Sequence, residues 1–200
     1  NIPSWLLLEE VRIAHLALSF SLLIVFGIRL IYLSRGEQTN TEKVHALLIA
    51  GSLLGIWLVS LLLTYLTYQP PAEEFISAVD ALSRYILGIP GAALAAWAIV
   101  LEQRTFQRRN MPDRGRDLLR AALALFIYGV FGQIFPRASF LYPANVINAT
   151  LFAQLFGIPI QLFRGAMAAL VAIFIVRALR AFEIERQLNL ARANEAKLAA

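Results

Sequence analysis

Two histidines are the first residues of this sequence whose type could hold a cofactor. His15 and His45 lie on successive apolar segments, and imidazoles from neighbouring membrane helices commonly ligate a haem iron. Successive segments cross in opposite directions, so these histidines fall near opposite faces of a hydrocarbon layer about 30 Å thick. One iron cannot reach both, and we expect no cofactor and no metal; haem shared with a partner's histidine is the alternative. His15 is expected to bond Glu10 or a nearby carbonyl.

Arg164 is the best candidate for a binding residue. It lies more than one turn inside the last apolar segment, which opens at Gly157-Ile158-Pro159. Ionisable residues inside a membrane are costly and usually have a function. Gln161 precedes Arg164 by one turn, and Gln133 ends the preceding apolar segment. A guanidinium there needs a carbonyl, a lipid phosphate or an anionic ligand, so we predict that Arg164, Gln161 and Gln133 contact a ligand, a lipid or a partner.

Pro90 and Gly91 are candidate hinge residues inside the third apolar segment. Proline removes one backbone hydrogen bond and can bend a helix. Small residues around it offer a face for close helix packing, namely Gly88, Gly91, Ala92, Ala93, Ala95 and Ala96. A packing kink is the first interpretation, and a signalling hinge is the second.

Motifs of catalysis are missing. The sequence contains no cysteine, which excludes disulfides, iron–sulfur clusters and thiolate zinc sites. It has no phosphate-binding loop, no G-x-S-x-G and no H-E-x-x-H pattern. We therefore expect no catalytic residue and no enzyme activity in this chain.

The elements that position these residues follow from composition. Of the 200 residues, 59% are hydrophobic and 16% are charged, and the mean hydropathy is +0.66. Soluble domains are roughly 45–50% apolar, so we expect lipid to solvate much of this surface. Five apolar segments reach the ~20 residues that a spanning helix needs, at about 12–33, 44–68, 81–101, 117–135 and 159–179. We predict an all-α, polytopic membrane helical bundle over residues 1–180, because unpaired backbone is not tolerated in lipid.

Basic residues predict how the bundle is oriented. With the amino end outside, only Arg12, Arg84, Arg137 and Arg164 of the 18 lysines and arginines fall on the outer side. Cytoplasmic connections are rich in Lys and Arg, so we predict that the amino end is outside and the carboxyl end is in the cytoplasm of a bacterial inner membrane. The acidic segment 69–80 then forms an outer loop. Because the charges lie between apolar segments, nucleic acid is excluded as a partner despite the net charge of +5.

Two further segments have their own patterns. Residues 136–158 are too apolar for a free loop, and 145–156 have helical spacing, which predicts an interfacial or re-entrant helix on the outer side. Residues 181–200 form a polar, cytoplasmic helical extension with a possible heptad seam. The seam positions are Ala181, Ile184, Leu188, Ala191, Glu195 and Leu198. A solvated helix end explains the same pattern equally well.

Three stretches resemble the membrane-embedded amino-terminal regions of certain bacterial sensor histidine kinases and diguanylate cyclases. They are Arg84-Tyr85-Ile86-Leu87-Gly88-Ile89-Pro90-Gly91, Phe156-Gly157-Ile158-Pro159-Ile160-Gln161-Leu162-Phe163-Arg164 and Arg177-Ala178-Leu179-Arg180-Ala181-Phe182-Glu183. The resemblance covers somewhat over half of the chain. It implies a sensor domain whose last span passes a signal to a cytoplasmic output module. That module is absent here, so we expect either part of a longer protein or a stand-alone relative.

A second hypothesis comes from another class of protein. The chain could serve as an accessory subunit of a respiratory or photosynthetic electron-transfer complex, without redox cofactors of its own. The expected partners are the lipid bilayer and either other membrane subunits or a second copy through the C-terminal helix. Neither the missing cysteines nor the missing enzyme motifs distinguish this role from a sensor.

The first prediction concerns orientation. A single cysteine introduced between residues 104 and 116 should be labelled by a membrane-impermeant maleimide only after the cytoplasmic side is opened, because the arginines hold this connection inside. A cysteine at 69–71 should be labelled in intact cells. The reverse pattern would overturn the assignment of sides.

Overall fold

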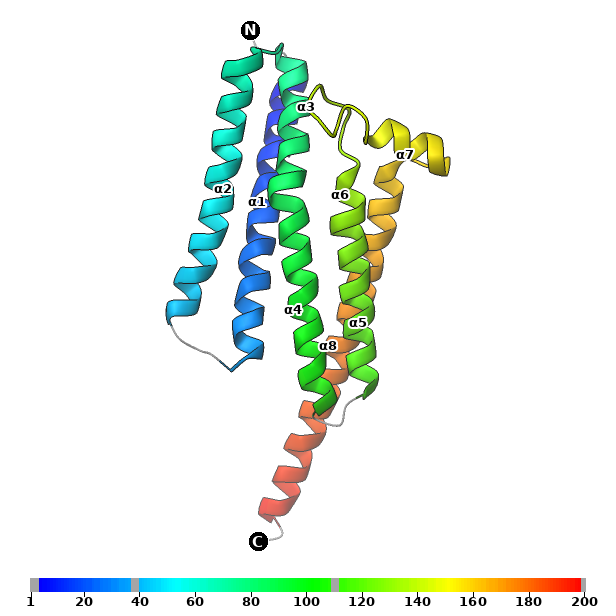
Figure 1. The fold of residues 1–200 in the computed structure, drawn as a ribbon. Coiled ribbons are helices and arrows are strands. Elements are labelled where there is room, and N and C mark those ends of the chain that lie inside the picture. The colour runs from blue at the N-terminus through cyan, green and yellow to red at the C-terminus, as the bar shows by residue number, and fades with distance from the viewer. Residues whose placement is uncertain (1–3, 37–39, 109–111, 199–200) are drawn as a thin grey trace.

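Five helical rods lie side by side (Figure 1) in the computed structural model, which describes residues 4–36, 40–108 and 112–198. The first two rods are α1 (Ser4–Ser34) and α2 (Asn40–Tyr68). The third joins α3 (Ala72–Leu82), the π-helical turn η1 (Ser83–Gly88) and α4 (Ile89–Arg108). The fourth joins α5 (Pro112–Phe126), the π-helical turn η2 (Ile127–Phe131) and α6 (Gly132–Ile134). The fifth is α8 (Ile160–Leu198).

Each rod contains a stretch that is long and apolar enough to cross a bilayer. The stretches cover 8–34, 43–68, 72–104, 115–134 and 160–180. Within the described ranges every regular element is a helix. The predicted all-α membrane bundle with five spanning helices is therefore confirmed.

The outer loop predicted over residues 69–80 was wrong, since all but its first three residues belong to α3. Pro71 precedes the helix, where its missing N–H costs nothing. Glu73 and Glu74 occupy the first turn, where carboxylates interact favourably with the helix dipole. The apolar face of α3, with Ile76 and Val79, packs on Ile13 of α1. The third span is thus longer than hydropathy alone predicted.

The rods form a row that is thicker at one edge. Helix α1 packs on both α2 and α4, and α5 packs on both α4 and α8, while α2 also contacts α3 and η1 of the third rod. Helices α2 and α8 lie at the two edges. Burial follows this order: 44% of the apolar stretch of the third rod is buried, against 11% for α2 and 6% for α8. The edge helices therefore leave broad apolar surfaces for lipid or for another protein.

The two ends of the row differ in chemistry. At one end, here called the basic end, α1 and α4 finish, α2 and α5 begin and α8 runs out as the tail. At the other end, α7 (Ala149–Phe156) lies across the direction of the rods (Figure 1). It starts at 149 rather than at the predicted 145, because Asn148 caps it by accepting the N–H groups of Thr150 and Leu151. Its Leu155 and Phe156 are exposed, as expected of an interfacial helix.

Glycines allow the rods of the centre to approach closely. A Cβ added to Gly27 of α1 would lie 2.8 Å from the backbone nitrogen of Ala95, and one added to Gly129 of η2 would lie 1.9 Å from the Cβ of Ala92. Ala92 and Ala95 are almost fully buried. The small-residue packing face predicted around Pro90 is therefore present in α4.

A π-helical turn precedes Pro90, the predicted hinge. In η1 the N–H of Ile89 donates to the carbonyl of Arg84, five residues earlier instead of four. Proline has no N–H of its own, and a widened turn is one way in which a helix absorbs the lost bond without stopping. The rod continues through Pro90 and Gly91 as helix, and hinge motion there stays a prediction.

The second prediction tests the close approach of the rods. Gly129→Ala should destabilise the protein by about 1–3 kcal/mol, because an extra methyl in a filled interface forces the backbones apart. Unfolding in mixed detergent, followed by circular dichroism, measures the change. Gly51→Ala and Gly55→Ala in α2 are matched controls, since an added Cβ meets no atom within 4 Å at either position. Equal effects at all three glycines would contradict the packing described.

Candidate functional site

A buried ion pair lies at the junction of α3 and η1. Arg84 donates from Nε to Oδ2 of Asp80 at 2.9 Å and from Nη2 to Oδ1 at 3.0 Å. The two side chains are only 11% and 3% exposed. Their i, i+4 spacing places them on one face of the helix. Because both oxygens and two nitrogens are engaged, the pair is bidentate, the strongest arrangement of these groups.

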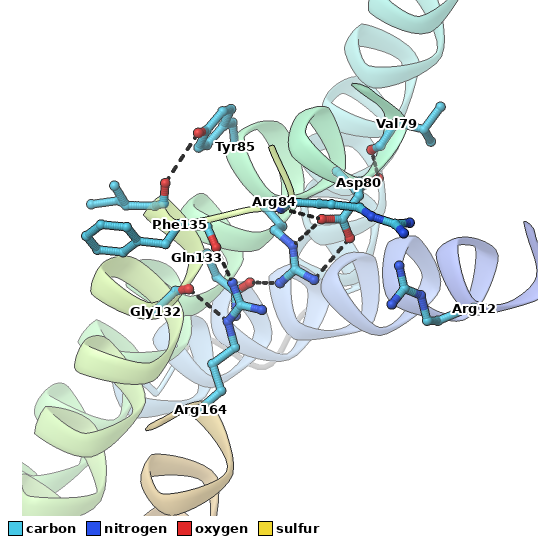
Figure 2. Close-up of polar contacts among 12 residues, drawn as sticks. Arg12, Val79, Asp80, Arg84, Tyr85, Gly132, Gln133, Phe135 and Arg164 are labelled. Carbon is cyan, nitrogen blue, oxygen red and sulfur yellow. Dashed lines mark hydrogen bonds and ion pairs between the residues drawn. The ribbon is translucent and has the colours of Figure 1, made fainter. Parts of the chain in front are cut away.

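The ion pair is joined to the neighbouring rod through Gln133 of α6. Arg84 donates from Nη1 to Oε1 of Gln133, and the backbone N–H of Arg137 donates to Oδ2 of Asp80 at 3.3 Å. Gln133 is 1% exposed, and its Nε2 donates to the carbonyl of Tyr128 at 3.5 Å, so both ends of its amide have partners inside the protein. Asp80, Arg84 and Gln133, together with Arg164 described next, are called the polar cluster (Figure 2).

Arg164 of α8 completes the polar cluster by binding the end of the fourth rod. It donates from Nε to the carbonyl of Gly132 at 2.9 Å and from Nη2 to the carbonyl of Phe135 at 2.7 Å. The hydroxyl of Tyr85 donates to the carbonyl of Ile134 at 3.3 Å. The last carbonyls of a helix lack partners within it, and a cation at this end also interacts favourably with the helix dipole. Arg164 and Tyr85 therefore cap α6 (Figure 2).

The position of the polar cluster explains why it must be paired. Arg84 precedes Arg104 by 20 residues of the same rod, which is about 30 Å of helix and close to the thickness of the hydrocarbon layer. With Arg104 at one face of that layer, the cluster lies near the other face. A buried charge that loses its partner there costs about 3–5 kcal/mol. The carbonyls at the end of α6 solvate the guanidinium of Arg164, which adds one positive charge to the neutral Asp80–Arg84 pair.

A cavity of about 580 Å³ opens beside the polar cluster at the α7 end. Its polar lining combines three carboxylates, one guanidinium and two hydroxyls, from Glu9, Glu73, Glu74, Arg137, Ser77 and Ser139. Arg137 belongs to both sites, because its side chain lines the cavity while its backbone N–H bonds Asp80. Glu9 is already held by Arg12 at 2.7 Å and by Arg137 at 3.7 Å. The cavity thus offers both charge signs to a small polar molecule.

The structure brings together two of the three predicted binding residues. Gln133 lies in α6 and Arg164 donates to carbonyls at the end of that helix, whereas Gln161 is exposed and lies outside the polar cluster. Of the partners proposed for Arg164, the carbonyls are present; contact with a ligand or lipid stays a prediction. Asp80 and Arg84 were missed because residue 80 was assigned to a loop, although an Asp–Arg pair at i, i+4 beside an apolar segment is a readable signal.

The histidines lie apart, as their sequence positions indicated. Nδ1 of His15 lies 2.8 Å from the carbonyl of Val11, one of the partners predicted for it. Nδ1 of His45 lies 3.0 Å from the hydroxyl of Tyr32. Since 17 helical residues separate His15 from Tyr32, the two imidazoles are about 25 Å apart. In the part of the chain that the structure describes, no three potential ligands converge on a metal site.

Comparison with known proteins gives no relative to set beside this site. Neither family models nor characterised proteins nor solved structures produced a match. The residues and their geometry therefore carry the functional argument.

The third prediction concerns Arg164. Arg164→Ala should destabilise the bundle by about 2–4 kcal/mol, because it leaves two buried carbonyls without donors. Arg180→Ala, on an exposed part of the same helix, should change stability by less than about 0.5 kcal/mol. Detergent unfolding curves of the two variants measure the difference. If both variants behave alike, Arg164 does not anchor α8.

Proposed function

We propose that this chain is a non-enzymatic, sensor-type domain of a bacterial inner membrane. In this proposal the amino end and α7 face outward, and α8 passes a signal to a cytoplasmic output module attached beyond the bundle. An attached kinase or cyclase, as the sequence resemblance implies, would supply the catalysis. The arginine-rich basic end supports this orientation.

One observation carries the proposal: Arg164 anchors α8 to the polar cluster, and α8 then runs unbroken to Leu198. A continuous helix of 39 residues can carry a displacement across the whole membrane. Beyond Arg164 it packs on α5 and, at Ile160 and Phe163, on the aromatic cluster of Phe135 and Phe152, and 6% of its apolar stretch is buried. At its other end, Arg177 donates to Asp117 at 3.2 Å, and both groups have water-accessible surface. Helix α8 can therefore shift against α5 at small cost in packing.

The route of the signal follows from the shared residue Arg137. A molecule that binds in the cavity and moves Arg137 would disturb the N–H bond to Asp80. Asp80 holds Arg84, which bonds Gln133 in α6, and the carbonyls of α6 hold Arg164. Helix shifts of about 1–2 Å are a known form of such switching. The Pro90–Gly91 hinge lies on the same rod as Arg84.

A second candidate function is favoured by the exposed apolar surfaces of the two edge helices. The edge helices α2 and α8 bury only 11% and 6% of their apolar stretches, as in a subunit that covers the side of a larger complex. The chain would then be an accessory subunit of a respiratory or photosynthetic complex. A second copy that pairs through the C-terminal helix would also use the α8 edge.

The fourth prediction separates the two functions. Spin labels on Leu48→Cys of α2 and Ala172→Cys of α8, both exposed, report the distance across the row in lipid nanodiscs. Asp80→Asn should shift that distance by about 1–2 Å if the polar cluster sets the position of α8. Glu10→Gln, an exposed carboxylate at the same end, should leave it unchanged.

An unchanged distance in Asp80→Asn would count against the sensor. The accessory role then requires that the chain purify from native membranes in a fixed ratio with subunits that carry haem or iron–sulfur clusters. Mass spectrometry of the purified complex measures that ratio. Purification without such subunits would count against the accessory role.

A further inference from the structure

Helix α7 presents surfaces of different chemistry. One face lies against the rods, where Phe152 is 1% exposed. Thr150 and Gln154, spaced i, i+4, share a second face that is polar and exposed. Leu155 and Phe156 are apolar and are 65% and 54% exposed. A helix that divides polar from apolar surface and lies across the spanning rods (Figure 1) fits the boundary between water and lipid.

The apolar surface of α7 continues into the surface of α8. Residues 157–159 separate Phe156, the last residue of α7, from Ile160, the first of α8. The stretch of α8 that can cross a bilayer also begins at Ile160. Ile158 and Leu162, on either side of this point, are 43% and 65% exposed. Helix α7 therefore lies at the level where the hydrocarbon layer begins.

Lipid is the occupant that this surface fits. A stable protein interface takes about 20–30 residues from each partner, whereas α7 has eight residues in all. Its exposed apolar side chains lie next to those of a spanning helix, so the lipid that covers α8 reaches α7 as well. The polar face of α7 can meanwhile stay in water.

Five phenylalanine rings join α7 to the ends of the fourth and fifth rods. The ring centroid of Phe152 lies 5.2 Å from that of Phe135 and 5.6 Å from that of Phe163. Phe131 and Phe156, with centroids 6.4 Å apart, complete what is here called the five-ring cluster. Aromatic pairs attract at such distances, and a closely packed interior transmits displacement. A movement of Phe152 therefore moves its neighbours.

The five-ring cluster includes the residues next to the anchor of α8. The carbonyl of Phe135 accepts Nη2 of Arg164 at 2.7 Å, while the ring of Phe135 contacts Phe152. Phe163 precedes Arg164 in α8, and its ring contacts Phe152 as well. The residues that hold α7 thus also hold Arg164. This connection reaches Arg164 without passing through Arg137 or the cavity.

Building on the proposed sensor function, we propose that the leaflet at the α7 end is itself a ligand of this domain. Leu155, Phe156 and Ile158 insert beside the lipid headgroups, and the depth of insertion sets the position of α7. The five-ring cluster and the connection 157–159 pass that position to Arg164 and so to α8. Insertion of amphipathic helices depends on lipid composition and curvature, so the packing of the leaflet is the quantity sensed.

The fifth prediction begins with the depth of α7. The chain has no cysteine, so a nitroxide label can be placed at one introduced cysteine. In phosphatidylcholine nanodiscs a label on Leu155→Cys should lie about 5–10 Å below the headgroups. Accessibility to oxygen and to a water-soluble nickel chelate measures this depth. A label on Gln154→Cys should be open to the chelate. Equal access of the chelate to both labels would overturn the proposal and leave this face to a protein partner.

The response of α8 is measured with the labels on Leu48→Cys and Ala172→Cys. Replacing part of the phosphatidylcholine by single-chain lysophosphatidylcholine changes lipid packing at the level of α7. The distance between the labels should then shift by about 1–2 Å. Leu155→Gln/Ile158→Gln removes lipid contacts, leaves the five rings in place and should abolish the shift. Circular dichroism checks that this variant is folded.

A matched control comes from the other edge of the bundle. Leu63→Gln/Leu66→Gln in α2 removes two leucines that are 57% and 60% exposed, and it should keep the shift. No shift in the labelled protein without these changes would overturn the proposal, as would an equal shift in Leu155→Gln/Ile158→Gln. The sensor function is judged separately: a shift in Asp80→Asn without a response to lysophosphatidylcholine would keep the sensor and reject the leaflet as its ligand.

Discussion

The bidentate ion pair of Asp80 and Arg84 is the interaction on which the arrangement of the rods at the α7 end depends. Lipid offers no hydrogen bonds, so a charged pair buried among spanning helices must be satisfied by the protein. Asp80 accepts hydrogen bonds from Arg84 and from the backbone N–H of Arg137. Arg84 donates to Asp80 on its own rod and to Gln133 on the fourth rod. Each bond beyond the pair reaches the fourth rod or the segment that follows it. The register of the third rod against the fourth is thereby fixed.

Close packing and helix distortion also help to fix the register of the third rod against the fourth. The two π-helical turns lie directly beside the polar cluster: η1 follows Asp80, and η2 precedes Gln133. A π-helical turn changes which face of a helix the residues beyond it present, because it adds a residue to one turn. Within η2, Gly129 lies against Ala92 of α4 with no room for a methyl group. The distortions that position the polar groups thus occur where the backbones approach most closely.

Much of the fold was predictable from sequence because lipid imposes a simple rule on helix length. The five spans, the short helix α7 and the packing face near Pro90 all follow from hydropathy and residue size. The site was less predictable. Arg164 and Gln133 stood out as polar residues at the ends of apolar segments, but Asp80 was hidden because α3 extends the third rod beyond its most apolar part. Gln161 shares the helix of Arg164, yet only a three-dimensional structure shows that it is exposed. The π-helical turns have no sequence pattern beyond the proline after η1.

The continuity of α8 has a geometric consequence. An α-helix turns by about 100° per residue, so every residue beyond Arg164 has an angular position set by its count from that anchor. Deleting or adding one residue after Arg180 would rotate all that follows by nearly a third of a circle, without altering any side chain of the bundle. In this protein the number of residues between Arg164 and the tail therefore sets the direction in which each side chain of the tail points.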